Sequence, residues 1–383
     1  MGEKLKFYLS LGLFSSFSVD AGTRLLLKTL AQQKILPTEG KILDSGCGTG
    51  IIAVSLKKKF PDLDITALDR DALALKFTGM NAALNNLPVE GFSLESGLLP
   101  GSIETPFFPE TSALNTMKYD LIISNIPAKA GSPVIEDFLS NCAGWLTDDG
   151  KVAVVIVASL TAAAEESLRR CGAVITHKEA DAQYTVFHFI PGNSAGRAGK
   201  FTDIYQRTSG RVNGFFGLPD FDSISYQTSL TLKTMKHQNF NGDTIIWNPG
   251  TGHIPAAVLT SVDKKPKSLI LAGNDLLQLK ASENNIRYAN LRLMHLPTME
   301  SLSTRLPERS IDFIIANPVQ ITGAGIEEEL MRASARLLRK GGRLLAAGRS
   351  SDISRLDKYK KGFTEISSEK FRGFRVLLLE KLS

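Results

Sequence analysis

The chain has 383 residues, 43% hydrophobic and 22% charged, the composition of an ordinary globular protein with room for two domains, and no apolar run approaches the length of a membrane span. Its three cysteines, Cys47, Cys142 and Cys171, are odd in number and widely spaced, so they fit neither a disulfide framework nor a zinc site and favour a reducing compartment. The net charge of +6 is unevenly distributed. Residues 1–192 carry 17 Lys and Arg against 21 Asp and Glu, a net of −4, and residues 193–383 carry 28 against 18, a net of +10. This asymmetry suggests that the second half binds a polyanion.

The N-terminal stretch admits two interpretations. Lys4 and Lys6, followed by the apolar run 7–14, outline a secretory signal peptide. The same run also leads into a loop and an amphipathic helix over residues 14–30, so it has a use within a folded domain. We expect the second arrangement and a cytoplasmic protein. Asp20 and Thr23, at the start of this helix, fit a helix N-cap.

An apolar strand, an acidic residue and three alternate glycines follow in residues 41–54, which read KILDSGCGTGIIAV. Glycines let the backbone turn sharply and lie against a ligand, because a Cβ would fill the space that the ligand needs. A dinucleotide fingerprint has the spacing G-x-G-x-x-G, whereas here the third glycine comes one residue early and Ile51 takes its place. The pattern therefore predicts either a different nucleoside-binding loop or a plain glycine-rich turn of an α/β protein.

The next elements add a second carboxylate. Residues 61–69 predict a strand that ends in Asp69, about twenty residues after the loop, where a carboxylate can accept both hydroxyls of a ribose. Apolar spacing predicts a helix over 71–84 and a short strand over 92–96, which ends in Ser96. Residues 97–118 are too long for a plain turn, and such loops are often lids and sometimes only surface additions without a function.

Three further strands complete this half of the chain. Residues 119–131 read YDLIISNIPAKAG and predict a strand with Asn125 and Pro127 at its tip, the edge where such sheets bind ligands. A strand over 150–157 is introduced by an Asp-Gly turn, and another is predicted over 185–190. Because residues 191–200 have the composition of a linker, we expect two domains, 1–192 and 193–383.

These motifs resemble those of a known family. The D-x-G-x-G-x-G loop resembles the first motif of class I S-adenosylmethionine-dependent methyltransferases. Together with the preceding FSSFSVDAGTRLLL, it is similar to the tandem-lobe ribosomal-RNA guanine-N2 methyltransferases of the methyltransferase small domain family. The resemblance implies a Rossmann-like α/β fold that uses S-adenosylmethionine and no metal. The cofactor contacts that it implies are Asp44, Gly46, Gly48, Gly50, Asp69, Ser96, Asp20, Gly22 and Thr23.

The second half repeats the first in the same order. The matching pairs are 230–235 with 25–30, 250–252 with 48–50, Asp275 with Asp71, 316–320 with 124–128, and 342–344 with 150–152. Five ordered matches, with offsets that drift only from 205 to 192, predict an internal duplication. We expect two tandem Rossmann-like class I methyltransferase lobes, the second degenerate, in a monomer whose lobes pack as a pseudo-dimer.

The two copies differ at the positions expected to bind the cofactor. Aligning the Gly-Thr-Gly segments puts Ile246 opposite Asp44 and Asn248 opposite Gly46, and aligning Asp71 with Asp275 puts Gly273 opposite Asp69. Each lost carboxylate removes hydrogen bonds worth about 1.5–3 kcal/mol, so two losses weaken binding by more than about a hundredfold. The first lobe is therefore expected to bind the cofactor and the second is not.

The substrate motif of the family, N-P-P-[FY], is altered here. In the family, the Asn side-chain oxygen and a Pro-linked carbonyl accept the two hydrogens of a base amine, and the aromatic ring stacks on the flipped-out base. The resemblance therefore implies that Asn125 and Pro127 are the catalytic residues, although Ile126 replaces the first proline and Ala128 the aromatic. The missing ring could be supplied by Phe17, Phe107 or Phe108, and Lys129 could meet a phosphate or only solvent.

The resemblance and the charge distribution together favour a methyltransferase acting on an exocyclic base amine of RNA, with guanine N2 of ribosomal RNA as the best candidate. Basic residues of the second half could neutralise several phosphates. They are Arg197, Lys200, Arg207, Arg211, Lys264, Lys265, Lys267, Arg332, Arg336, Arg339, Lys340 and Arg343. Two alternatives stay open: methyl transfer to a small molecule or protein side chain, which the missing aromatic permits, and a non-catalytic RNA-binding or assembly protein.

Overall fold

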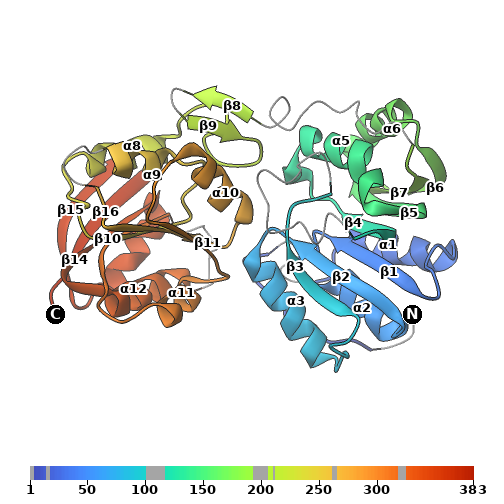
Figure 1. The fold of residues 1–383 in the computed structure, drawn as a ribbon, viewed down its shortest axis with the longest axis horizontal. Helices are drawn as coiled ribbons and strands as arrows, with labels where there is room; N and C mark the ends of the chain where they lie inside the picture. The colour runs from blue at the N-terminus through green and yellow to red at the C-terminus, as the bar shows by residue number, and fades with distance from the viewer. Residues whose placement is uncertain are drawn as a thin grey trace. The chain divides into compact units, whose positions relative to one another are not determined.

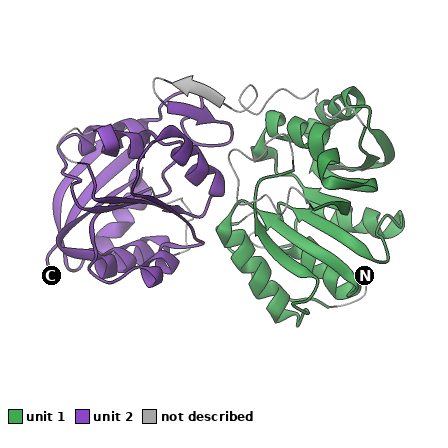
Figure 2. Cartoon of the chain, in the orientation of Figure 1, with its two compact units in different colours: residues 1–205 green, residues 206–383 purple. Residues whose placement is uncertain are grey.

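The computed structural model describes residues 4–13, 18–100, 117–192, 206–209, 212–260, 265–317 and 325–383. The chain divides into two units, residues 1–205 and residues 206–383 (Figure 2). Each unit is built on one seven-stranded sheet with helices on both faces (Figure 1). The two α/β units that the sequence predicts are therefore confirmed.

The first unit alternates strands and helices. Its helices are α1 (Ala21–Gln32), α2 (Ile51–Lys59), α3 (Ala72–Leu84), α5 (Ser132–Asn141) and α6 (Thr161–Arg170), with short 3-10 turns η2 (Ala128–Ala130), η3 (Cys142–Trp145) and η4 (Ala158–Leu160). Its strands are β1 (Gly40–Ser45), β2 (Leu63–Asp69), β3 (Phe92–Ser96), β4 (Tyr119–Asn125), β5 (Leu146–Val157), β6 (Val174–Ala180) and β7 (Tyr184–Ile190). The strand order is β3-β2-β1-β4-β5-β7-β6, with β7 antiparallel to both of its neighbours.

Two strands differ from the sequence expectation. β5 begins at Leu146 rather than at Gly150, and its pairing with β4 shifts register between Tyr119 and Leu121, so the expected Asp-Gly turn lies within the strand as an irregularity. β6 was not predicted, because this edge strand exposes most of its side chains and lacks a buried alternating face. Most of the loop expected to be a lid, residues 101–116, lies outside the described residues.

The core of the first unit lies on both faces of its sheet. Leu43 and Ile122 face one way and pack with residues of α5 and α6, whereas their neighbours Ile42 and Leu121 face the other way and pack with residues of α1 and α2. Strands that are buried on both faces read as continuous apolar runs, as the sequences of β1 and β4 do. This packing fixes the carboxyl ends of β1, β2 and β4 at one edge of the sheet.

The second unit repeats this architecture. Its helices are α8 (Tyr226–Met235), α9 (His253–Thr260), α10 (Leu276–Asn285), α11 (Met299–Arg305), α12 (Ile326–Leu337) and α13 (Ser350–Ile353), with the 3-10 turn η5 (Ser354–Lys358). Its strands are β10 (Asp243–Trp247), β11 (Ser268–Gly273), β12 (Leu291–His295), β13 (Ile311–Ala316), β14 (Leu338–Arg349), β15 (Phe363–Phe371) and β16 (Phe374–Lys381), preceded by the hairpin β8 (Gln206–Ser209) and β9 (Val212–Phe215). The order β12-β11-β10-β13-β14-β16-β15 matches that of the first unit strand for strand, which confirms the duplication.

Matching hydrogen bonds support the residue pairs derived from sequence. The Gly46 amide donates to the Leu68 carbonyl at 2.8 Å, and the Asn248 amide donates to the Ala272 carbonyl at 2.8 Å. A second pair was not predicted: Asn81 bonds to the backbone of Tyr8 in both directions, as Asn285 does to that of Asn213. The N-terminal stretch thus has a place in the fold, and the described part of the chain contains no helix that could span a membrane.

Candidate active site

The buried carboxylate of Asp44 lies where β1 meets the glycine loop. Its Oδ2 accepts a hydrogen bond from the Ala53 amide of α2 at 2.9 Å, while its Oδ1 has no partner among the described residues. Burial raises the pKa of Asp44 to about 7, against the effect of the Ala53 hydrogen bond and with a further rise from the charge of Asp69. A buried acceptor without a donor is costly, so this oxygen fits a cationic or hydrogen-bonding ligand group.

The three glycines of the loop do not play the same part. All have positive φ, 75° at Gly46, 57° at Gly48 and 78° at Gly50. A Cβ on Gly48 would meet no described atom within 4 Å, and one on Gly46 would meet only Leu99 Cδ2 at 3.8 Å. A Cβ on Gly50 would lie 2.7 Å from Thr78 Cγ2. Gly46 and Gly48 therefore border open space, whereas Gly50 allows α2 to pack closely against α3.

Asp69 joins the tip of β2 to the same loop. Its Oδ2 accepts from the Gly48 amide at 2.9 Å and its Oδ1 from the Asp71 amide at 2.9 Å. Ser96 lies beside Asp69 as its register partner on β3. The loop is held from α3 as well, because Thr78 donates to the Gly48 carbonyl at 3.1 Å.

Asn125, at the end of β4, is bonded to the start of α1. Its Nδ2 donates to Asp20 Oδ2 at 3.0 Å and to Thr23 Oγ1 at 2.8 Å. Asp20 also caps α1 by accepting from the Thr23 amide at 3.1 Å. Gly22 is required beside this contact, because a Cβ there would lie 2.7 Å from Tyr184 Cδ1 and 2.8 Å from Asp20 Oδ2.

The residues after Asn125 form a short 3-10 turn. Ile126, at the position of the first proline of the family motif, is 2% exposed and packs in the core. The Pro127 carbonyl already accepts from the Ala130 amide at 2.9 Å. The carbonyl linked to the proline nitrogen is that of Ile126, the residue before Pro127. Ala128 is exposed.

The structure brings the sequence-derived residues into two groups. Asp44, Gly46, Gly48, Asp69 and Ser96 gather around the glycine loop, and Asp20, Gly22 and Thr23 gather around Asn125. Phe17, Phe107, Phe108 and the side chain of Lys129 lie outside the described residues.

Sequence reasoning missed three residues of this site: Thr78, Asn81 and Tyr184. One sequence signal pointed to Asn81, because an asparagine recurs at the matching position 285. Asn81 donates to the Thr49 carbonyl at 2.8 Å, and Asn285 donates to the Thr251 carbonyl at 2.7 Å.

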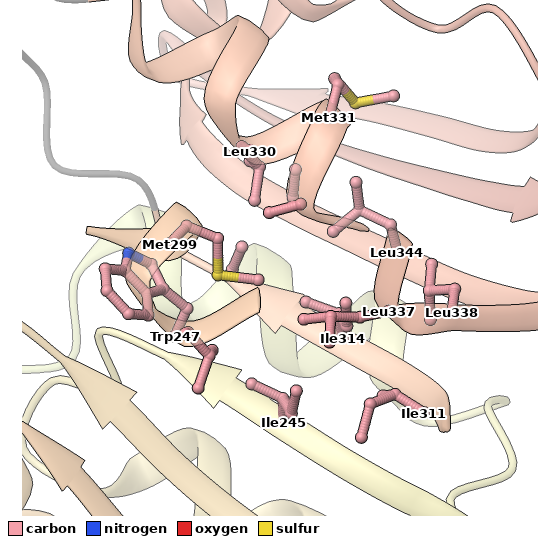
Figure 3. Close-up of a cluster of buried hydrophobic side chains, with 14 of the residues drawn as sticks. Ile245, Trp247, Met299, Ile311, Ile314, Leu330, Met331, Leu337, Leu338 and Leu344 are labelled. Atoms are coloured by element: carbon pink, nitrogen blue, oxygen red, sulfur yellow. The ribbon is translucent and has the colours of Figure 1, made fainter. Parts of the chain in front are cut away.

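The second unit has different side chains and contacts at the corresponding positions. Trp247 follows Ile246 on β10 and is 6% exposed, packing with Met299 in the core (Figure 3). The Gly250 amide donates to the side-chain oxygen Gln278 Oε1 at 3.1 Å, whereas the matching Gly48 amide donates to the Asp69 carboxylate. A Cβ on Gly273 would lie 2.7 Å from Asn248 Oδ1, so Asn248 stands where the ribose-binding carboxylate is expected.

Of the twelve basic residues expected to meet phosphate, seven have described side chains, and four of these seven are paired with carboxylates within the second unit. Arg332 bonds to Glu300 at 2.9 Å, Arg336 to Glu308 at 3.1 Å and Arg343 to Glu380 at 3.1 Å, and Arg339 contacts both Asp243 and Asp312. Lys265, Lys267 and Lys340 are exposed. The side chains of Arg197, Lys200, Arg207, Arg211 and Lys264 lie outside the described residues.

A seven-stranded sheet of this order, with a glycine loop after β1 and a carboxylate at the tip of β2, defines the class I methyltransferase fold. The family model described as methyltransferase small domain matches residues 4–188 and again residues 212–376. The chain therefore belongs to the methyltransferase small domain family, of which it carries two copies.

Curated relatives match over part of their length. The chain is 37% identical to the ribosomal RNA small subunit methyltransferase C of Pasteurella multocida over an aligned segment of 127 residues, which is 33% of each chain. It is 36% identical over 148 residues to the protein of the same name from Pseudoalteromonas translucida, which covers 38% of each chain. The matched segments thus span well under half of these relatives.

One solved structure resembles the whole chain. It is the T. thermophilus 16S rRNA N2 G1207 methyltransferase (RsmC), in complex with AdoMet and guanosine, with a TM-score of 0.70 over 98% of this chain and 95% of that one. At 17% sequence identity this likeness supports the tandem fold alone.

Proposed function

We propose that the first unit binds S-adenosylmethionine and transfers its methyl group to an exocyclic amine of an RNA base, with guanine N2 of ribosomal RNA as the best candidate. The observation that carries the proposal is the arrangement at one sheet edge. There Asp44, Asp69 and Asn125 lie at the carboxyl ends of the adjacent strands β1, β2 and β4. The glycine loop follows β1 and is bonded to Asp69. The names of the curated relatives and of the T. thermophilus enzyme favour the same substrate.

The loop residues fit this cofactor. S-adenosylmethionine is a nucleoside with a cationic sulfonium and an amino-acid tail, and when bound it supplies an activated methyl group. The unpartnered Asp44 Oδ1 is a suitable acceptor for the ammonium of the tail. Open space at the Cβ positions of Gly46 and Gly48 lets the ligand approach the backbone. Asp69, at the tip of β2, is placed to accept the ribose hydroxyls.

The contribution of Asn125 is to position the amine. The nitrogen lone pair of a base amine is delocalised into the ring, and its two hydrogens need acceptors in the reactive orientation. Asn125 Oδ1 and the Ile126 carbonyl fixed by Pro127 are candidates for these acceptors. Methyl transfer at about 3 Å is mainly a problem of alignment, so this positioning is the principal task of the protein groups.

An RNA substrate would be tested with tritiated S-adenosylmethionine and total RNA from a strain that lacks the gene. We expect label to enter ribosomal RNA, in a base that nuclease mapping identifies as N2-methylguanine. A ribosomal substrate also agrees with the cytoplasmic location expected from sequence. Label that enters only small molecules or protein would contradict the RNA assignment. Bound cofactor without transfer to any RNA fraction would favour a non-catalytic RNA-binding protein.

A second candidate keeps the chemistry but changes the acceptor. Ala128 is exposed at the position where the family motif has an aromatic ring, so the ring that would stack on a base is absent from this position. A small molecule or protein side chain would not need it. RNA binding that weakens steeply with salt separates the two, because a small-molecule enzyme has no use for phosphate contacts.

A further inference from the structure

The carboxylate of Asp20 forms the centre of a hydrogen-bond network that ends on Asn125. Its Oδ2 accepts from the Thr23 amide at 3.1 Å and from Asn125 Nδ2 at 3.0 Å, and its Oδ1 accepts from the Tyr184 hydroxyl at 2.8 Å. The hydrogen bond to Asp20, followed by burial, raises the pKa of Tyr184 to about 12, so its phenol keeps the proton that it donates. Both oxygens of Asp20 are therefore held in place by donors.

This network determines which end of the Asn125 amide faces outward. Oxygen and nitrogen of an amide have nearly the same shape, so only their partners decide the orientation. A carboxylate can only accept, and therefore Nδ2 must face Asp20. Its two hydrogens are used by Asp20 Oδ2 and Thr23 Oγ1, which leaves Oδ1 as the outward acceptor. Rotation by 180° would bring Oδ1 against Asp20 Oδ2, two acceptors that repel.

Among its described residues the second unit lacks this network, and its asparagine, Asn317, has a different set of partners. Ser225, Gln227 and Phe374 stand at the positions of Asp20, Gly22 and Tyr184. Gln227 Nε2 donates to Asn317 Oδ1 at 3.4 Å, and Asn317 Nδ2 donates to the Asn248 carbonyl at 3.1 Å. Both ends of the Asn317 amide are thus used within the unit.

We propose that Asp20 is a positioning residue, held by Tyr184, that fixes the Asn125 amide with its oxygen toward the substrate amine. This inference rests on the proposed function, in which that oxygen accepts a hydrogen from the amine. It assigns Asp20 and Thr23 to the orientation of Asn125 rather than to direct cofactor contact. Gly22 serves by its missing Cβ, which lets Tyr184 reach Asp20.

A double-mutant cycle tests this role. We expect Asp20→Asn to lower kcat at least about tenfold, with an unchanged affinity for S-adenosylhomocysteine, because an amide at position 20 allows Asn125 to rotate. In the Asn125→Ala background, the same substitution should have no further effect. Asn317→Ala is the matched control, with wild-type kcat expected. Losses that multiply in the double variant would overturn the proposal, as would an unchanged kcat in Asp20→Asn.

A second readout does not depend on activity. The side-chain amide signals of Asn125 in a ¹⁵N-labelled sample, assigned by their loss in Asn125→Ala, should shift in Asp20→Asn and shift less in Tyr184→Phe. Unchanged signals in Asp20→Asn would overturn the proposal even if the enzyme is active. Shifted signals in a protein that methylates no RNA would uphold the network and refute only the proposed function.

A separate observation concerns an aromatic cluster in the second unit. Tyr226 and Phe371 are 46% and 48% exposed, and their rings meet edge to face with centroids 5.7 Å apart. The Arg372 guanidinium lies over both rings, 4.7 Å and 5.6 Å from their centroids. Arg372 has φ 45° in the two-residue turn between β15 and β16, a position that normally favours asparagine, aspartate or glycine.

The cluster lies at the carboxyl end of β14. Arg349, the last residue of β14, is exposed and pairs in register with Phe374, and the Ser350 amide donates to the Gly373 carbonyl at 2.8 Å. Neither Arg349 nor Arg372 forms an ion pair with a carboxylate among the described residues, in contrast to Arg332, Arg336, Arg339 and Arg343. The first unit has Ala21 in place of Tyr226 and no aromatic residue in its turn 181–183.

The geometry points to this cluster, Tyr226, Phe371, Arg372 and Arg349, as a binding surface for unpaired RNA. Exposed rings offer faces on which bases stack, and two arginines without carboxylate partners offer contacts to the adjoining phosphates. Double-stranded RNA presents no free base faces, so single strands and loops are the expected targets. This inference rests on RNA being the substrate.

The test is fluorescence anisotropy with labelled oligouridylate at constant salt. Phe371→Ala should weaken binding about fivefold or more, and Tyr226→Ala similarly, while Tyr359→Ala, another exposed tyrosine of this unit, should bind like wild type. Arg372→Ala should also reduce the salt dependence of binding. Wild-type affinity in both aromatic variants, or no binding of oligouridylate by the wild type, would overturn the surface. Methyl transfer to other RNA in the same samples would then still uphold the proposed function.

Discussion

Cofactor affinity should depend on pH through Asp44. Its carboxyl has a pKa of about 7 in the free protein because it is buried. A cofactor whose ammonium pairs with Asp44 binds the ionised form, so binding below this pKa requires the loss of a proton. The dissociation constant should therefore rise about tenfold for each pH unit below 7 and level off above it, which corresponds to about 1.4 kcal/mol at pH 6.

Titration calorimetry with S-adenosylhomocysteine between pH 5.5 and 8 measures this directly. Asp44→Asn should bind more weakly at pH 8 and show a flat profile, whereas the exposed control Asp62→Asn should keep the wild-type slope. Proton release on binding at pH 6, seen as a dependence of the heat on the buffer, is a second sign of the same linkage. A flat wild-type profile, or the same slope in Asp44→Asn, would refute the reasoning.

The free protein should show the corresponding effect on stability. A carboxyl whose folded-state pKa is raised from 3.8 to about 7 makes the native state bind more protons than the unfolded state between these values. The unfolding free energy should therefore fall as the pH rises from about 4 to about 7, by up to about 4 kcal/mol from this group. In urea denaturation, the unfolding free energy of the wild type should fall more steeply between about pH 4 and about pH 7 than that of Asp44→Asn. A steeper fall in Asp44→Asn would contradict the burial of an ionisable Asp44.

Three further predictions concern single residues. Asp69→Ala removes the acceptor of the Gly48 and Asp71 amides and should weaken S-adenosylhomocysteine binding at least about tenfold by calorimetry; unchanged affinity would mean that the cofactor binds elsewhere. Gly50→Ala places a Cβ against Thr78 at positive φ and should lower the unfolding free energy by about 1–3 kcal/mol in urea, with partial recovery in Gly50→Ala/Thr78→Ser; a wild-type midpoint would exclude the close packing. Asn125→Ala should lower methyl transfer on the order of a hundredfold while binding cofactor normally, whereas Asn317→Ala should keep wild-type transfer and binding; equal losses in the two variants would assign catalysis to both units.

Much of the fold could be predicted because its strands are buried on both faces. Continuous apolar runs end in Asp44, Asp69 and Asn125, and the order of these runs recurs in the second half. The strand β6 could not be predicted in the same way, since it is exposed at the sheet edge. The register of β5 depends on pairing with β4, which local sequence does not encode.

The site was predictable in its parts but not in its contacts. Spacing placed the glycine loop and the carboxylates Asp44 and Asp69 at strand ends, and the family resemblance supplied their expected role as cofactor contacts. The bond from Tyr184 to Asp20 joins residues 164 positions apart, and no local pattern marks it. The resemblance implied that Asp20 and Thr23 contact the cofactor, and the helix start also allowed an N-cap; the structure shows Asp20 as the N-cap of α1 and both residues bonded to Asn125. Gly50 likewise looks like its neighbours in sequence but faces α3.

The central proposal is that only the first unit holds the cofactor. A crystal structure of the full chain grown with S-adenosylhomocysteine tests it most directly. We predict one ligand per chain, lying against Gly46 and Gly48, with its ammonium near Asp44 Oδ1 and its ribose at Asp69. A ligand seated against Gly250 in the second unit, or one in each unit, would contradict the account.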